Sequence, residues 1–250
     1  MKMKIILNVA THGDEKIGYR VAKEIEKLPI DKNILVVQVA NRNAFKLNKR
    51  YIDQDLNRSF PGKKQGNYEQ RVAYKLSPII KLADIVIDIH STTSDLKDAL
   101  IVTKLNKKTR EYIKVIQPKY VLVMRATKNN ALISQAKVGI AFEYGKDKDP
   151  VTLKKTILGI KKLLKHLRII DFPFSRNNVT TNYFDVVSTV PKSKGYKLLA
   201  SVKNYRLIKK GQVYARSKDE PLVADEDFYP ILFGQENYEN IFGFKGKKIF

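Results

Sequence analysis

Apolar residues occur along this chain in two recurring patterns. Short continuous apolar runs predict buried strands at 5–10, 34–40, 83–90, 99–103, 120–124 and 138–144. Apolar residues three or four positions apart predict helices at 17–28, 69–82, 109–116 and 150–167. A strand, a helix and a second strand in this order imply parallel strands joined by a crossover. The first 172 residues are therefore predicted to form an α/β domain.

The pattern changes after Phe172-Pro173-Phe174. Short segments with the character of strands follow at 183–190, 196–199, 205–208, 212–215 and 228–233, separated by turns such as Lys210-Gly211. Residues 173–250 are therefore predicted to form a small, β-rich C-terminal domain, next to a domain of residues 1–172.

The composition is that of a globular protein and excludes several classes. Hydrophobic residues make up 43% of 250 positions, and no apolar run approaches the ~18 residues of a membrane span. The chain contains no cysteine, which excludes disulfides and thiolate metal sites. The N-terminus carries no signal-peptide pattern, so a cytoplasmic protein without a membrane partner is expected.

The net charge of +23, from 48 Lys and Arg against 25 Asp and Glu, is unusual. It is compatible with attraction to anions such as carboxylate substrates or nucleic acid. A lysine-rich solvated surface is the favoured interpretation, because the lysines are scattered along the whole chain. A nucleic-acid-binding protein remains an unlikely alternative that depends on charge alone.

Two of the three histidines stand at the ends of predicted strands. His12 follows the first strand and precedes Glu15 by three residues, so both side chains can turn toward one point. His90 ends a later strand, and Asp88 shares its side of that strand and could hydrogen-bond the imidazole. An H-x-x-E spacing also arises by chance, and His90 could be a core histidine. His166 is predicted to lie on a helix surface.

Charged residues also gather in two other places. The polar segment 50–62 carries Arg50, Asn57 and Arg58, and is either a functional loop or a surface loop with ion pairs of little value. Glu143 is an acid at the end of an apolar strand, where it is either paired structurally or poised as a general base.

Together these residues have the chemistry of a hydrolytic metal site. Two imidazoles and a carboxylate can hold zinc, which polarises a carbonyl and lowers the pKa of its water to about 7. A nearby carboxylate can take a proton and return it to a leaving amine. One guanidinium can stabilise an oxyanion, and a second can bind a substrate carboxylate.

In these residues and their order, the sequence resembles the aspartoacylase and succinylglutamate desuccinylase family, relatives of the zinc carboxypeptidases. The resemblance is carried by His12-Gly13-Asp14-Glu15, by residues 50–58 (RYIDQDLNR), by residues 88–94 (DIHSTTS), by Phe142-Glu143-Tyr144-Gly145, and by Tyr229-Pro230 with Tyr238. These motifs keep the family's order and span most of the chain.

The resemblance implies one Zn²⁺ per chain on His12, Glu15 and His90, with Glu143 as general base and acid. It implies Arg50 at the oxyanion, and Asn57, Arg58 and Tyr238 at the substrate. It also implies a mixed, mostly parallel sheet between helices and a β-rich C-terminal domain that narrows the site entrance. The expected activity is zinc-dependent removal of an acyl group from a small anionic N-acyl amino acid.

One departure from the family pattern concerns specificity. Aspartoacylase has a further arginine about ten residues ahead of the catalytic glutamate, whereas residues 129–137 here read NNALISQAK. Arg125 or Lys137 could replace it. N-acetylaspartate is therefore not the expected substrate. A zinc carboxypeptidase acting on peptides is the main alternative, and a homo-oligomer is left open.

Overall fold

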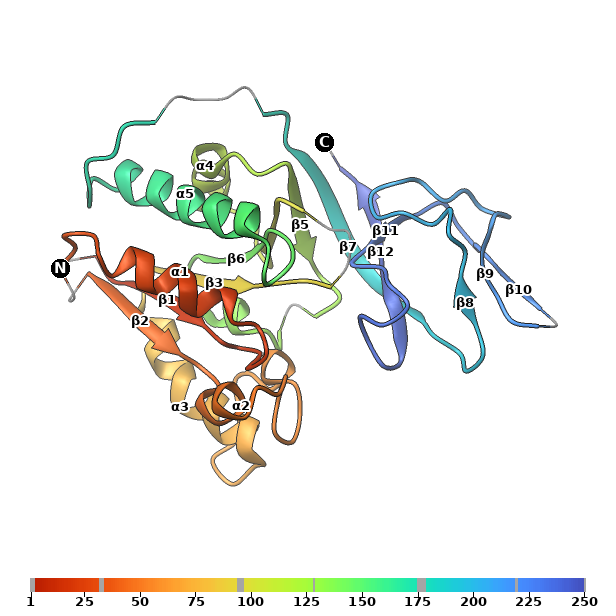
Figure 1. The fold of residues 1–250 in the computed structure, drawn as a ribbon, viewed down its shortest axis with the longest axis horizontal. Helices are drawn as coiled ribbons and strands as arrows, with labels where there is room; N and C mark the ends of the chain where they lie inside the picture. The colour runs from red at the N-terminus through yellow and green to blue at the C-terminus, as the bar shows by residue number, and fades with distance from the viewer. Residues whose placement is uncertain are drawn as a thin grey trace.

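The computed structural model describes residues 3–31, 34–93, 97–127, 129–174, 179–218 and 220–249. Within these ranges, one sheet of nine strands has the order β11-β12-β7-β5-β4-β6-β3-β1-β2 (Figure 1). Its strands are β1 (Ile5–Val9), β2 (Leu35–Val39), β3 (Ile85–His90), β4 (Ala99–Val102), β5 (Tyr120–Met124), β6 (Gly139–Glu143), β7 (Asn182–Pro191), β11 (Tyr229–Ile231) and β12 (Ile241–Lys248).

The strand pairings confirm the predicted mixed, mostly parallel sheet. Strands β2, β1, β3 and β6 are parallel neighbours. Strand β4 runs antiparallel to β6, and β5 and β7 continue parallel to β4. The antiparallel strands β12 and β11 complete the far edge.

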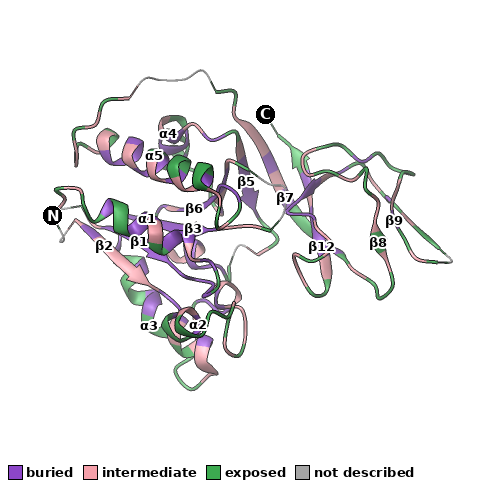
Figure 2. Cartoon of the chain, viewed as in Figure 1, coloured by how far each residue is buried: buried purple, intermediate pink, exposed green. Residues whose placement is uncertain are grey.

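Helices cover both faces of the parallel half of the sheet (Figure 1). They are α1 (Ile17–Ile25), α2 (Arg42–Leu47), α3 (Tyr68–Leu82), α4 (Lys107–Ile116) and α5 (Pro150–His166). Alternate residues of a strand face opposite sides, so Ile5, Leu7 and Val9 pack in the core with α1, α4 and α5, whereas Ile6 packs with α3. Buried residues accordingly dominate β1, β3 and β6 (Figure 2).

Local signals fix the helix starts near the site. Asn67 and Gln70 form a reciprocal capping box that begins α3. Asp149 caps α5, and Pro150 occupies its first turn, where a missing N–H costs nothing. Asn41 accepts a hydrogen bond from Ala44 N and begins α2. His166 lies exposed at the end of α5, as predicted.

The C-terminal strands extend the main sheet and then form a second one. Strand β7 pairs with β5, and β12 pairs with β7. A three-stranded antiparallel sheet has the order β10 (Pro221–Val223), β9 (Val213–Arg216), β8 (Lys197–Leu198). A division into domains near residue 172 stays a prediction.

The sequence pattern missed one α-helix and one strand close to the site. Helix α2 buries only Ala44, so it has no apolar stripe to reveal it. Strand β12 contains Gly243 and Gly246, which are atypical of a strand. A side chain at Gly243 would meet Phe233 within 2.5 Å, so close packing explains this glycine. Among the described residues, no helix is both long enough and apolar enough to cross a membrane.

Candidate active site

The candidate residues gather where β1, β3 and β6 end. Asn8 lies opposite Asp88, and His90 lies opposite Glu143. All four residues lie on the face of the sheet that carries α3, since residues two apart share a face. The carboxyl end of a parallel sheet is where ligands bind in open α/β folds. The register of the sheet therefore brings His90 and Glu143 together, although they lie 53 positions apart in the sequence.

His12 and Glu15 reach the same place through a tight turn between β1 and α1. Gly13 N donates to Arg50 O over 3.1 Å. A Cβ on Gly13 would lie 2.1 Å from the backbone carbon of Ala44, so only glycine lets this turn pack against α2. Asp147, from the loop after β6, accepts from Ile17 N over 2.6 Å and caps α1.

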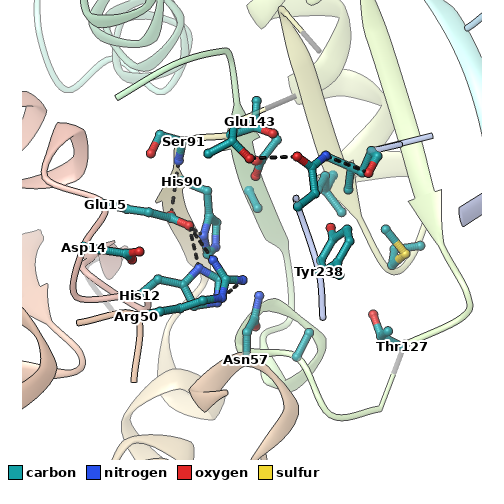
Figure 3. Close-up of a pocket in the computed structure, with 18 of the residues that line it drawn as sticks. His12, Asp14, Glu15, Arg50, Asn57, His90, Ser91, Thr127, Glu143 and Tyr238 are labelled. Atoms are coloured by element: carbon teal, nitrogen blue, oxygen red, sulfur yellow. Dashed lines mark hydrogen bonds and ion pairs between the residues drawn. The ribbon is translucent and has the colours of Figure 1, made fainter. Parts of the chain in front are cut away.

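His12, Glu15 and His90 form a buried group suited to a metal ion. Their ligand atoms lie within 4.8 Å of one another. Oε1 of Glu15 is 2.7 Å from His12 Nδ1, and Oε2 is 2.9 Å from His90 Nδ1. Figure 3 shows the Glu15 carboxylate between the two imidazoles. The structure thus brings together the three residues that the sequence suggested.

Each imidazole is held at its other nitrogen by a carboxylate. His12 Nε2 is 3.1 Å from Asp55 Oδ1, and His90 Nε2 is 2.9 Å from Asp88 Oδ2. The expected contact between Asp88 and His90 is therefore present. Asn8 and Thr11 donate to Asp88 over 2.7 and 2.9 Å, which fixes this carboxylate in turn.

This arrangement fits a zinc ion chemically. Carboxylates bound to both Nε2 atoms leave both Nδ1 atoms to act as ligands on the side of Glu15. Two histidines and a glutamate form a common catalytic zinc set, which keeps a fourth position for water or substrate. The fit rests on buried donors that converge on one point from two strand ends.

Burial and the neighbouring ionisable groups shift the pKa values of His12, Glu15 and His90. Burial opposes ionisation of Glu15, but the adjacent imidazoles outweigh it and lower its pKa. Burial likewise disfavours charged imidazoles, yet nearby carboxylates raise the pKa of His12, and raise that of His90 further. Each pKa shift runs in the direction that favours the ionised form of that side chain.

Arg50 lies beside the metal ligands. Its Nη1 donates to Glu15 Oε1 over 3.3 Å, and its Nη2 is 3.6 Å from Asp55 Oδ2. The guanidinium therefore faces the edge of the candidate metal position, where it could meet a developing negative charge.

A residue that sequence reasoning missed organises the loop after Arg50. Glu69, in the first turn of α3, is completely buried. Its carboxylate accepts from the backbone N–H groups of Ile52, Asp53 and Gln54, over 2.7, 2.9 and 3.2 Å. Asn41 donates to it as well, over 3.0 Å. The available signal in the sequence was an acid three and four residues ahead of Val72 and Ala73, on the apolar face of the predicted helix.

Asn57 and Arg58 lie on the short 3-10 helix η1 (Leu56–Arg58) that follows this loop. Oδ1 of Asn57 accepts from Leu132 N over 2.9 Å, in a second 3-10 helix, η2 (Leu132–Gln135). This contact directs the amide nitrogen of Asn57 into the cavity (Figure 3). Both Asn57 and Arg58 line the cavity.

Glu143 and Tyr238 face the same cavity from other elements. Burial, reinforced by the Glu15 carboxylate, raises the pKa of Glu143 to about 8. Tyr238 lies across the cavity from His12 and Arg50 (Figure 3), on the segment between β11 and β12. Burial and the nearby Glu143 raise the pKa of the Tyr238 phenol, which therefore stays protonated near neutral pH.

The cavity has a volume of about 690 Å³, and its lining includes all eight residues predicted for the metal, the catalysis and the substrate. Its residues come from both sequence halves, and Leu232, Tyr238 and Phe244 belong to the C-terminal strands and their connection. Ser94, the last residue of the third motif, lies outside the described residues.

The suggested replacements for the specificity arginine lie elsewhere, which corrects that expectation. Arg125 is exposed and donates to Asp185 over 2.6 Å. Lys137 is exposed and lies 3.3 Å from Asp84. Neither residue lines the cavity, and the segment 129–137 contributes Ala131 and Ile133 to the lining instead.

A buried group of two histidines and one glutamate beside an acid and two arginines is typical of metal-dependent hydrolases. Comparison with known protein families then identifies the family. The family model "Succinylglutamate desuccinylase/Aspartoacylase catalytic domain" matches residues 2–167, about two thirds of the chain. The chain belongs to this family.

Individual relatives agree with this assignment. The chain is 24% identical over 219 residues to a probable aspartoacylase of Trichodesmium erythraeum, a match that covers 70% of this chain and 75% of that protein. It is 25% identical over 188 residues to the N-alpha-acetyl-L-2,4-diaminobutyric acid deacetylase of Halomonas elongata, covering 66% and 55% of the two chains. The fold is similar to that of murine aminoacylase 3, with a TM-score of 0.80, 18% identity and coverage of 99% and 95%.

Proposed function

We propose that this protein is a zinc-dependent amidohydrolase that removes the acyl group from a small N-acyl amino acid. The observation that carries the proposal is the convergence of His12, Glu15 and His90 within 4.8 Å, next to Glu143 on the adjacent strand. Family membership supports an enzyme that acts on amide bonds, and the named deacetylase and aspartoacylase relatives support the substrate class.

The metal would be held by His12 Nδ1, His90 Nδ1 and the Glu15 carboxylate. When bound, zinc supplies a Lewis acid for the amide carbonyl and lowers the pKa of a coordinated water. Asp88 would keep the His90 imidazole in the tautomer that leaves Nδ1 available. At His12, Nε2 faces both Asp55 Oδ1 and Arg50 Nη2, each 3.1 Å away.

Glu143 carries the proton in this proposal. Its carboxylate accepts a proton from the attacking water and returns it to the amine that leaves. Burial and the Glu15 carboxylate raise the pKa of Glu143 in the metal-free site, a direction that favours uptake of the proton.

The two arginines interact with different negatively charged groups of the substrate. Arg50, beside Glu15, stabilises the oxyanion that develops on the amide carbonyl oxygen. Arg58 and the Asn57 amide nitrogen, which both line the cavity, donate hydrogen bonds to the α-carboxylate of the substrate. The Tyr238 phenol, which remains protonated, donates a hydrogen bond to the bound substrate.

The size of the cavity favours a small substrate over a peptide. About 690 Å³ lies in the range of small-molecule sites. Leu232 and Tyr238 form one wall, so the C-terminal strands limit the length of chain that can enter.

The test is hydrolysis of a panel of N-acetyl, N-succinyl and N-formyl amino acids by the zinc-loaded protein, followed as release of free amino acid. We expect turnover that a chelator removes and that added Zn²⁺ restores. Absence of turnover across the panel, or cleavage of peptides in preference to N-acyl amino acids, would contradict the proposal.

A further inference from the structure

The cavity has an apolar wall that the proposed chemistry does not use. It is formed by Ile101, Met124, Ala131, Ile133, Leu232 and Phe244. Five of these side chains are buried in the protein core, and Ile101 is half-buried. They join the core beneath α3 to the core of the C-terminal strands.

The apolar wall begins next to the proton-transferring acid. Ile101 in β4 lies opposite Ala141 in β6. Glu143 and Ala141 lie on one face of β6, because they are two residues apart. Ile101 pairs with Ala141 and extends the same face of the sheet into β4. Ile101 packs with Met124 and Phe244, which continue this face toward β12.

The other side of the apolar wall flanks the carboxylate clamp. Leu132 N donates to Asn57 Oδ1 over 2.9 Å, and its neighbours Ala131 and Ile133 both line the cavity. In an amino acid, the carbon that bears the α-carboxylate also bears the side chain. A substrate gripped by Asn57 and Arg58 would therefore present its side chain beside Ala131 and Ile133.

Two of the charged groups that line the cavity, Glu143 and Arg58, border the apolar wall, and none belongs to the wall itself. Within the described part of the chain, the charged residues of the lining are Asp14, Glu15, Arg50, Arg58, Glu143, Lys146, Asp147, Lys148 and Glu236. The loop with Lys146 and Lys148 is bound to the start of α1 through Asp147, on the side of the metal ligands. Arg125 and Lys137 are engaged with Asp185 and Asp84 outside the cavity. Among the described residues, Arg58 is the cation that borders the apolar wall, and the proposed function uses it for the α-carboxylate. A second carboxylate at the wall would lose water without a cation of its own.

We propose that this cavity selects N-acyl amino acids with uncharged aliphatic or aromatic side chains and discriminates against aspartate and glutamate derivatives. The inference rests on the proposed function and adds the identity of the side chain. Apolar contacts with the wall stabilise the preferred substrates, whereas an acidic substrate would bury a side-chain carboxylate that no described residue of the wall neutralises.

The first experiment compares substrates on the unaltered, zinc-loaded chain. N-acetyl and N-succinyl derivatives of leucine, methionine and phenylalanine are assayed against those of aspartate and glutamate. Within each acyl series, kcat/KM should be at least about tenfold higher for the apolar amino acids. Equal or better hydrolysis of acidic derivatives overturns this inference and leaves the proposed function standing. Failure to hydrolyse any of them overturns both.

Two variants of one wall residue test the assignment of the subsite. Ile133→Arg places a guanidinium at the wall and should lower the ratio of leucine to aspartate turnover at least about tenfold. Ile133→Ala removes contact area and should lower kcat/KM for the leucine derivative about tenfold, with little change for aspartate. Leu82→Arg, at an exposed end of α3, adds the same charge and should leave the ratio unchanged.

Ile133→Ala keeps the test decisive if the arginine variant does not fold, which circular dichroism would reveal. A leucine-to-aspartate ratio that stays at its original value in the folded variants overturns the subsite assignment.

Discussion

The proposed metal end of the cavity, with His12, Glu15 and His90, and the apolar wall are built in different ways. At the metal end, each side chain is held by specific partners, as His12 is held by Asp55 and His90 by Asp88. At the apolar wall, Ile101, Met124 and Phe244 come from three strands and contribute shape alone. Substitutions at the two ends should therefore fail differently, with large losses of chemistry at one end and graded changes in selectivity at the other.

The largest effect is expected at Glu143. Glu143→Gln keeps the shape of the side chain and removes the group that accepts the proton, so kcat should fall by roughly 10²–10⁴. The zinc content of the purified protein should be unchanged, because Glu143 is outside the proposed ligand set. Steady-state kinetics and metal analysis on the same sample measure both. Near-normal kcat would remove Glu143 from its assigned role.

Glu69 should be the most sensitive position for stability. Glu69→Ala leaves the N–H groups of residues 52–54 without their acceptor, which should cost roughly 2–5 kcal/mol in the free energy of unfolding. Urea denaturation monitored by circular dichroism measures this cost. Glu24→Ala, which removes an exposed glutamate, serves as the control and should change stability by less than about 0.5 kcal/mol. Equal stability of the two variants would show that the Glu69 contacts do not hold the loop.

Arg58 should mainly affect binding. Arg58→Ala removes a charge-assisted contact with the substrate carboxylate, so KM should rise roughly 10–100-fold while kcat changes less. Arg125→Ala removes an arginine that is paired with Asp185 outside the cavity and should leave KM unchanged. If both variants gave the same KM, the carboxylate clamp would have to lie elsewhere.

The smallest effect is expected at the apolar wall. Met124→Leu conserves volume, so it should change the free energy of unfolding by less than about 1.5 kcal/mol. Its expected consequence is a change of a few-fold in the ranking of apolar substrates, measured as relative kcat/KM. A loss of activity as large as that of Glu143→Gln would contradict the division between the two ends.

The same contrast explains what could be predicted from the sequence. The central strands could be predicted because they are buried on both faces and read as continuous apolar runs, as in β3. The candidate metal ligands could be suggested because histidines are scarce and two of them stand at predicted strand ends. The fold class was therefore predicted correctly, and the positions of His12, Glu15 and His90 agree with the expected site.

The remaining features depend on contacts that a linear pattern does not contain. Strand β12 is stabilised by pairing with β7 and β11, although its glycines and lysines are atypical of a strand. Glu69 acts through backbone groups of a loop that precedes it by about 15 residues. The apolar wall consists of ordinary core residues, and only the three-dimensional arrangement shows that they border a cavity.

The most direct test of the central claim is the zinc content of the purified protein, measured by mass spectrometry of the metal in wild type and in His90→Ala. The account predicts about one zinc per chain in the wild type. In the variant, which loses one of three protein ligands, it predicts little or no zinc and no hydrolysis. A wild-type protein that hydrolyses N-acyl amino acids without zinc, or a His90→Ala variant that retains full zinc and full activity, would contradict it.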